Sequence, residues 1–153
     1  MTPAVSVIIP VFNRVDRLGE AVESVLSQDA SVEVVIVDDC STDGSAELAR
    51  QIAAARSQVM VSSLTPNKGP AAARNRGLKL ATSEFVSFLD SDDLMTAGRL
   101  KAQLAEIAIR PDHLVMGCQQ ILVGEGVSPP ALIVAELANS DRHYIMSMLG
   151  SKD

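Results

Sequence analysis

Four short runs of apolar residues alternate with longer segments in which apolar residues recur every three or four positions. The apolar runs cover residues 5–9, 32–37, 59–61 and 84–89. After the first run, apolar side chains return at helical spacing, at Val15, Leu18, Ala21, Val22, Val25 and Leu26. Short β-branched runs are typical of strands, whereas this spacing places apolar residues on one face of a helix. The pattern therefore predicts the order β-α-β-α-β-α-β-α.

Prolines and capping residues predict where these elements begin and end. Because proline cannot donate a hydrogen bond to a sheet, we expect the first strand to end at Pro10. Asn13 is a suitable cap for the helix that follows, and the polar residues 41–45 suit the start of the second helix. Pro70 fits the first position of a third helix, and Pro111 should end the last clear one.

The predicted strands are apolar enough to be covered by helices on both faces, which is typical of a parallel sheet. We therefore predict an α/β fold, a three-layer α/β/α sandwich of Rossmann-like type with a mainly parallel sheet. The clear pattern occupies residues 1–110. Residues 111–153 form a poorly defined continuation, with candidate strands at 114–116 and 120–123 and a helical segment at 131–149.

Composition supports a folded domain and narrows the choice of partners. The 153 residues are 47% hydrophobic but only 3% aromatic, so the core should be built from aliphatic side chains. A net charge of −6 argues against a nucleic-acid partner. The longest apolar runs are far below the roughly 18 residues of a membrane-spanning helix, so we expect no transmembrane segment.

The expected location is cytoplasmic, with the inner face of the membrane as a further option. Residues 1–4 lack the basic start of a signal peptide. Cys40 and Cys118 have neither metal-ligand spacing nor a CxxC pattern. They are therefore expected to be reduced thiols.

Acidic residues follow two of the predicted strands. Asp38 and Asp39 come after the second strand, and residues 90–93, which read Asp-Ser-Asp-Asp, come after the fourth. Ligands of open α/β sheets bind beyond the carboxyl ends of the strands, where these residues should meet. Five carboxylates at one edge repel one another, and a divalent cation would relieve that repulsion. Asp90 and Asp92 can point to the same side of an extended strand end and hold Mg²⁺ or Mn²⁺.

Each of these features also has a simpler interpretation. On its own, the acidic run at 90–93 would be a solvated turn that caps the next helix. Asp38 or Asp39 could bind a base or a ribose hydroxyl, or could cap the helix that begins near Thr42. Phe12 could pack on a planar base or lie in the core.

Two arginines interrupt a run of small residues at positions 67–77. Arg74 could pair with the acidic edge or with a phosphate, whereas Arg76 could be an exposed helix cation. No GxGxxG follows the first strand, which disfavours a Rossmann-type dinucleotide site. The absence of GxxxxGK[ST] from the sequence excludes a P-loop.

Five stretches stand out together: VSVIIPVFNR (5–14), LGEAVESVLSQ (18–28), VEVVIVDDCSTDGS (32–45), NKGPAAARNRG (67–77) and EFVSFLDSDD (84–93). In this order they resemble the N-terminal, nucleotide-sugar-binding half of a family 2 glycosyltransferase of the GT-A fold. The resemblance covers about the first 110 residues. It implies binding of a nucleotide-diphosphate sugar, with a UDP-sugar favoured, and transfer of the sugar to an acceptor hydroxyl with inversion.

The resemblance also implies roles for individual residues. The set on the side of the base and ribose would comprise Pro10, Val11, Phe12, Asn13, Asp38 and Asp39. Within it, Pro10 to Phe12 would line the base pocket and Asp39 would bind the uracil. The set on the side of the metal and phosphates would comprise Asp90, Asp92, Asp93 and Arg74. Asp90 and Asp92 would form the DxD motif that contacts ribose and Mn²⁺ or Mg²⁺, Asp93 is an alternative metal contact, and Arg74 would approach the phosphates.

The second half of such an enzyme, which normally supplies the general base, has no recognisable counterpart here. Glu125, Glu136 and Asp141 are late carboxylates, but none lies in a matching motif. We therefore expect a chain truncated relative to the family, and the acceptor, whether sugar, lipid or protein, is left open, as is a homo-oligomer. The alternative is a nucleotide-sugar-binding module without transfer activity. A phosphoacceptor receiver domain is disfavoured, because its acidic pair would follow the first strand.

Overall fold

The computed structural model describes residues 3–109, and the predicted alternation of strands and helices is confirmed there. The elements are β1 (Val5–Val11), α1 (Leu18–Leu26), β2 (Val32–Asp38), α2 (Ser45–Ala55), β3 (Val59–Ser63), α3 (Pro70–Leu78), β4 (Phe85–Phe88) and α4 (Arg99–Ile109). The chain divides into two units, Met1–Glu106 and Ile107–Asp153. The strands and helix considered for residues 111–153 lie outside the described residues. Within residues 3–109, no helix has the length and apolarity needed to cross a bilayer.

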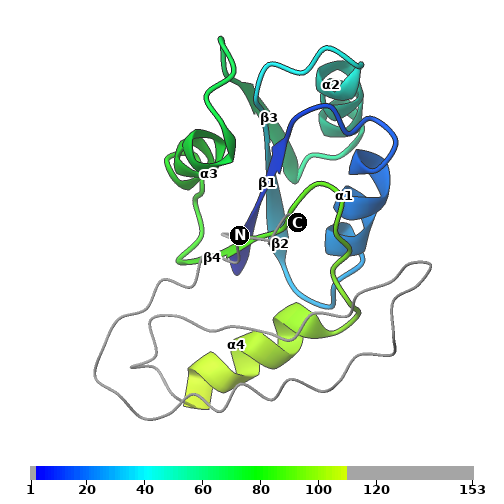
Figure 1. Ribbon diagram of the computed structural model, residues 1–153. Coiled ribbons are helices and arrows are strands. Elements are labelled where there is room, and N and C mark those ends of the chain that lie inside the picture. Colours follow the sequence, from blue (N-terminus) through cyan, green and yellow to red (C-terminus); the bar gives the residue numbers. More distant parts are fainter. Residues whose placement is uncertain (1–2, 110–153) are drawn as a thin grey trace, which may run out of the picture. The chain divides into compact units, whose positions relative to one another are not determined.

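The four described strands form one parallel sheet in the order β3-β2-β1-β4. Helix α3 lies on one face of this sheet and α1 and α2 lie on the other (Figure 1). The predicted three-layer α/β/α arrangement with a parallel sheet is therefore confirmed for the first unit. Because all strands run the same way, their carboxyl ends meet at one edge.

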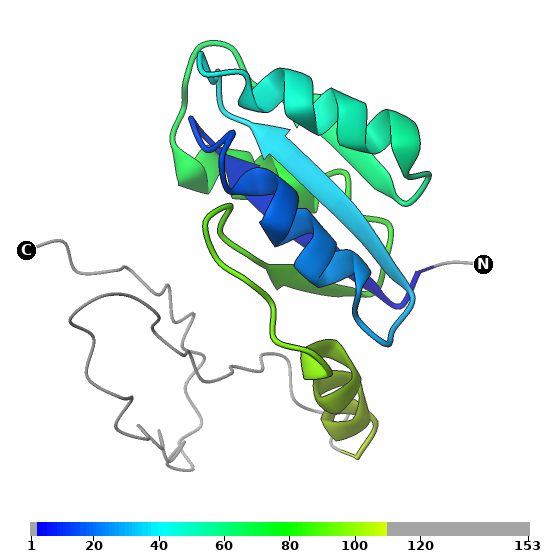
Figure 2. The same ribbon diagram turned by 90° about the vertical axis from the view of Figure 1, so that its right-hand side faces the viewer.

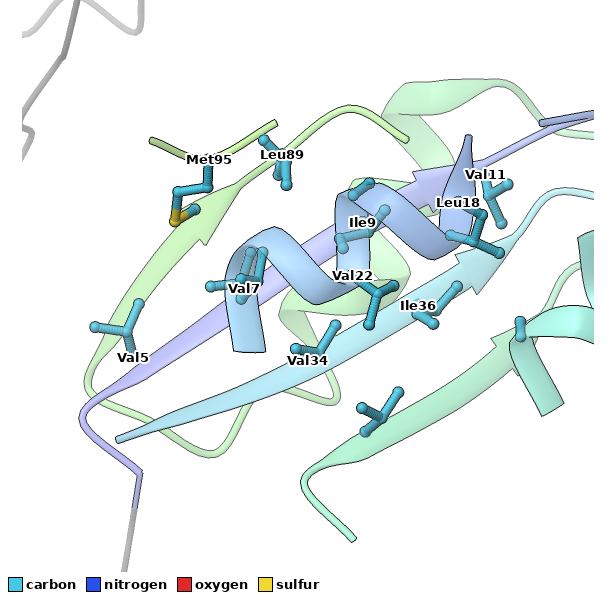
Figure 3. Close-up of a cluster of buried hydrophobic side chains, with 14 of the residues drawn as sticks. Val5, Val7, Ile9, Val11, Leu18, Val22, Val34, Ile36, Leu89 and Met95 are labelled. Atoms are coloured by element: carbon cyan, nitrogen blue, oxygen red, sulfur yellow. The ribbon is translucent and has the colours of Figure 1, made fainter. Parts of the chain in front are cut away.

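The core is aliphatic, as the composition predicts, and consists of two clusters on opposite faces of the sheet. The larger cluster joins β1 and β2 to α1 and includes Val7, Ile9, Val22, Val34 and Ile36 (Figure 3). The smaller cluster, under α3, consists of Ile8, Val35, Val37 and Ala73. Successive strand residues point to opposite faces, so β1 and β2 are buried on both sides. Each fully buried Val, Ile or Leu contributes about 1.5–3 kcal/mol to folding.

Small residues let α3 approach the sheet closely. Gly77 of α3 is buried, and a Cβ atom placed on it would overlap Cγ2 of Ile8 in β1. Ala73, one turn earlier, is fully buried on the same cluster. The small-residue run that precedes β4 in the chain therefore serves to bring α3, and with it Arg74, close to the strand ends.

The prediction that the first strand ends at Pro10 is wrong. Pro10 pairs with Val37, and β1 continues to Val11. The carbonyl of Ile8 accepts from the Leu89 N–H at 3.1 Å, so the alternate residues 8 and 10 face the β4 side. Because β4 has ended by Phe88, the missing N–H of Pro10 deprives no partner of a hydrogen bond.

The prediction that Asn13 caps the first helix is also wrong. Helix α1 begins at Leu18, and its N-cap position is Arg17. Asn13 adopts a left-handed conformation, with φ of 52°, and its side-chain Oδ1 accepts from the Thr42 N–H at 2.8 Å. Asparagine tolerates this conformation better than most residues, and here it joins the loop after β1 to the loop after β2.

The prediction that helices cover both faces of every strand is wrong for β4. Val86 and Phe88 are 37% and 41% exposed, although the strand reads as an apolar run. β4 is an edge strand of the described sheet and pairs only with β1 there. Hydrophobicity alone does not distinguish such an edge strand from a central one.

Candidate functional site

The loops that follow β1 and β2 lie side by side beyond the strand ends (Figure 2). Three successive backbone N–H groups of the first loop donate to side chains of the second. Asn13 donates to Ser41 Oγ at 3.0 Å, Arg14 to Ser45 Oγ at 2.9 Å, and Val15 to Asp43 Oδ2 at 3.0 Å. The loop after β1 is therefore held in place by residues about 30 positions later in the chain.

Asp43 is a structural cap that the predicted site does not include. Its Oδ1 accepts from both the N–H and the hydroxyl of Ser45, at 2.9 and 2.6 Å. The hydrogen bond from the Ser45 hydroxyl lowers the pKa of Asp43; burial opposes this effect, and the Val15 N–H adds to it. Asp43 is thus a charged residue that holds Ser45 at the start of α2, where the N-cap position is Gly44.

Asp39 ties the end of β2 to the start of α3. The residue is only 3% exposed, and its two carboxylate oxygens accept from the N–H groups of Lys68 and Gly69, at 2.8 and 2.6 Å. Its carbonyl accepts from Asn67 Nδ2 at 2.9 Å. A carboxylate has about four acceptor positions, so two remain for a ligand. Asp39 thus holds the loop that leads into α3 and is not the cap of the helix near Thr42.

Asp38 is also buried, at 2% exposure, but it acts locally. Both of its carboxylate oxygens lie 3.3 Å from the N–H of Ser41, which they accept. This contact closes the turn after β2, where Cys40 has a left-handed φ of 66°. The two neighbouring aspartates therefore stabilise different loops: Asp38 the turn after β2, and Asp39 the loop before α3.

The acidic loop after β4 is bound by two arginines from different elements. Arg74 of α3 donates to Asp90 Oδ1 at 2.6 Å, and Arg14 of the loop after β1 donates to Asp92 Oδ2 at 3.2 Å. The Arg74–Asp90 pair realises one of the two partners expected for Arg74. Arg76, in contrast, is exposed and donates to Ser62 Oγ at 3.0 Å, in line with its interpretation as a surface cation.

The pKa of Asp93 is raised above its ordinary value, in part by its acidic neighbours. Burial raises its pKa most, the carboxylates of Asp90 and Asp92 raise it further, and Arg99 opposes them. Its N–H donates to the carbonyl of Asp90 at 3.0 Å, which closes a tight turn. The carboxylates of Asp90 and Asp92 therefore still act on Asp93, although each of them contacts an arginine.

The donor atoms of the acidic loop suit a hard divalent cation, although they are not yet gathered around one point. Among residues 3–109, no three Asp, Glu, His or Cys side chains lie together as a ready set of metal ligands. Asp90 and Asp92 are each turned toward an arginine. Mg²⁺ and Mn²⁺ bind carboxylate oxygens, often only one or two together with phosphates, so Asp90, Asp92 and Asp93 fit such an ion.

The predicted base-side residues fall into two groups. Phe12 is 46% exposed, which argues against the core and leaves its ring accessible to a ligand. Val11 is 1% exposed, packs in the larger core cluster, and its carbonyl accepts from the Asp39 N–H at 2.9 Å. Pro10 is buried in the strand beside it.

Gln28, which follows α1, fixes the segment after the acidic loop. Its side chain is 7% exposed, donates to the carbonyls of Met95 and Thr96 at 3.4 and 3.0 Å, and accepts from the Leu100 N–H at 3.3 Å. The hydroxyl of Ser24 accepts from the Met95 N–H at 2.9 Å. A glutamine at the end of a predicted helix gives no sign of a partner about 70 residues away, so sequence reasoning missed this contact.

Comparison with known proteins places the chain in a family. The family model described as Glycosyl transferase family 2 matches residues 6–148. The succinoglycan biosynthesis protein ExoO of Rhizobium meliloti is 33% identical over 137 residues, which cover 89% of this chain and 39% of ExoO. The chain spans less than half the length of curated relatives such as ExoO.

Two solved structures of similar sequence share the fold of this chain. TarS of S. aureus, residues 1–349 in complex with UDP, is 38% identical with a TM-score of 0.64, over 69% of this chain and 32% of that one. The mannosyltransferase PcManGT from Pyrobaculum calidifontis, in complex with GDP-Man and Mn²⁺, is 32% identical with a TM-score of 0.62, over 69% and 32% of the two chains. With the parallel α/β sheet and the family match over most of its length, this chain belongs to glycosyl transferase family 2.

Proposed function

We propose that this chain binds a nucleotide-diphosphate sugar, with a UDP-sugar favoured, at the carboxyl edge of its sheet. The observation that carries the proposal is the meeting of the acidic loop after β4 with Arg74 of α3, through the 2.6 Å contact to Asp90. A diphosphate is bound by positive charge, and the carboxylates of the acidic loop can bind a divalent metal ion that provides it. TarS, 38% identical, has been solved with UDP and with UDP-GlcNAc, which supports this choice of donor.

For the base, we propose the exposed ring of Phe12 and the buried carboxylate of Asp39. A half-exposed phenyl ring at a strand end can stack on a pyrimidine, while Asp39 has spare acceptor positions for an N–H of the base. Pro10 and Val11 would form the floor through the backbone, because the Val11 side chain is buried in the core. Asn13 and Asp38 would act indirectly, by holding the turns around this pocket.

For the metal, we propose that Asp90, Asp92 and Asp93 hold Mn²⁺ or Mg²⁺. The raised pKa of Asp93, which burial and its two acidic neighbours cause, is in keeping with a place for a cation. PcManGT, which shares 32% identity, contains Mn²⁺ together with GDP-Man. When bound, such an ion stabilises the negative charge that develops on the departing diphosphate.

The proposed reaction is inverting sugar transfer. An acceptor hydroxyl attacks the anomeric carbon, its proton goes to a general base, and the bond from that carbon to the diphosphate oxygen breaks as UDP leaves. Arg74 would keep the leaving diphosphate in place. The late carboxylates Glu125, Glu136 and Asp141 lie outside the described residues, so the base is not assigned. Membership of a transferase family favours this reading over a binding module without activity.

A donor-hydrolysis and transfer assay tests the enzymatic part of the proposal. The chain would be incubated with UDP-GlcNAc and Mn²⁺, with and without a mixture of sugar acceptors, and released UDP would be measured. We expect UDP release above that of an Asp90→Asn variant, in which the Arg74 partner is neutral. Binding of UDP without any release in either condition would instead favour the non-catalytic module.

A further inference from the structure

Arg14 has no role in the proposed donor site, yet it contacts the acidic loop directly. We propose that Arg14 takes the place of the divalent cation at Asp92 while the metal is absent, and turns to the donor's diphosphate once the metal binds. This inference rests on the proposed function, because it supposes a metal at Asp92 and a diphosphate beside it. It adds Arg14 to the site as a positioning residue and as a competitor of the metal.

The backbone of Arg14 is fixed. Its N–H donates to the hydroxyl of the buried Ser45 at 2.9 Å, and both chain neighbours are held in the same way by Ser41 and Asp43. The guanidinium also donates to the carbonyl of Asn13 at 3.0 Å. The side chain thus starts from an anchored point and can swing only within its own length.

The contact between Arg14 and Asp92 is suited to exchange with a metal ion. Arg14 Nε meets Asp92 Oδ2 at 3.2 Å through one hydrogen bond, and the two side chains are 48% and 50% exposed. Ion pairs of this exposure are screened by water and contribute little to stability. A divalent ion that coordinates the same oxygen directly can therefore displace the guanidinium.

Once displaced from Asp92, the guanidinium of Arg14 would need a new anionic partner. Arginine stays protonated at all ordinary pH values, so a displaced Arg14 remains a cation that needs an anion. The diphosphate carried by the metal would lie at the same edge, and guanidinium groups bind phosphate oxygens in a two-pronged manner. Arg74 is already engaged with Asp90 at 2.6 Å, so Arg14 is the more readily released of the two.

Metal binding without nucleotide tests the first half of the proposal. Mn²⁺ titrations followed by electron paramagnetic resonance would compare wild type with Arg14→Gln. We expect the variant to bind Mn²⁺ about two- to fivefold more tightly, which matches the loss of one competing surface ion pair. Arg17→Gln is the matched control, because it removes the same charge nearby from an exposed side chain that contacts Asp16 and Glu20. Equal Mn²⁺ affinities for Arg14→Gln and wild type would overturn the inference.

UDP binding at saturating Mn²⁺ tests the second half, and here the expected change has the opposite sign. Arg14→Gln should bind UDP about five- to tenfold more weakly, since it lacks a charge-assisted hydrogen bond to the diphosphate. Arg14→Lys should recover part of that affinity, and Arg17→Gln should match wild type. Unchanged UDP affinity in Arg14→Gln would refute the transfer to the diphosphate. If wild type itself bound neither Mn²⁺ nor UDP, the proposed function would fail, whereas a failure confined to Arg14 variants counts against this inference alone.

Discussion

Gly77 of α3 packs on Ile8 of β1 so closely that a single added methyl group would overlap the Ile8 Cγ2 atom. This contact sets the spacing between α3 and the sheet, and α3 carries Arg74, which binds Asp90. The requirement for glycine here is one of space, because Gly77 lies inside a helix. The packing of one helix on one strand thus helps to position a charged residue of the candidate site.

We therefore expect Gly77→Ala to destabilise the chain by about 1–3 kcal/mol, the usual cost of overpacking a core. Alanine favours helices over glycine by about 1 kcal/mol, so a gain in stability would be expected if space were available. Gly19→Ala in α1 is the matched control, because the space that its added methyl group would occupy has no other atom within 4 Å. Urea denaturation should show a loss for Gly77→Ala and a small gain for Gly19→Ala. A gain in both variants would contradict the close packing.

The buried Glu33 makes the stability of the fold depend on pH. This glutamate is 8% exposed and accepts from the Ser6 hydroxyl, and from the N–H and hydroxyl of Thr82 at 2.6 and 3.0 Å. Burial alone would raise its pKa, but the hydrogen bonds from Ser6 and Thr82 outweigh burial and lower it below the ordinary 4.5. A lowered pKa stabilises the fold above the unfolded-state value and ceases to do so as pH falls through the folded-state value.

Glu33→Gln should therefore lower the free energy of unfolding by about 1–2 kcal/mol at pH 7. The difference from wild type should shrink as the pH falls below the ordinary glutamate pKa of 4.5 and through the lower pKa of folded Glu33. Urea denaturation at a series of pH values measures both effects, and the exposed Glu84→Gln serves as control. A stability difference that stays constant from pH 7 to pH 3 would argue against an ionised, hydrogen-bonded Glu33.

Gln28 provides a prediction about the segment that follows the loop with Asp90–Asp93. Its side chain binds the backbone of Met95, Thr96 and Leu100, so Gln28→Ala removes the side-chain partner of the buried Met95 carbonyl and the buried Leu100 N–H. We expect a loss of about 1–3 kcal/mol in unfolding free energy and faster hydrogen exchange at the Leu100 amide. Gln51→Ala on the exposed face of α2 is the control. Unchanged exchange at Leu100 would show that Gln28 does not hold this segment.

Most of the fold could be predicted because each described element has a periodic pattern of its own. Strand residues such as Val34–Val37 are buried continuously, and Leu18, Val22 and Val25 recur on one helix face. Which strand lies beside which in the sheet has no comparable local pattern in the sequence. That is why the end of β1 at Val11 and the exposed face of β4 at Val86 and Phe88 were predicted wrongly.

The candidate site was predictable to the extent that strand ends identify it. Asp39 and the acidic loop could be placed at one edge from the order of elements alone. Their partners could not, since Arg14 binds Asp92 across 78 positions and Asp39 binds the N–H groups of Lys68 and Gly69. Such contacts depend on loop conformations that no short sequence pattern specifies.

The most direct test of the proposed function is a calorimetric titration with UDP, with and without Mn²⁺, on wild type and Asp92→Ala. Asp29→Ala is the control, since it removes an exposed carboxylate that pairs with Lys101 at 2.6 Å on another part of the surface. We expect UDP to bind wild type and Asp29→Ala in a Mn²⁺-dependent manner, and to bind Asp92→Ala about tenfold more weakly or worse. Tight UDP binding that ignores Mn²⁺ and survives Asp92→Ala would contradict the metal assignment, and no UDP binding by wild type would contradict the proposed donor site.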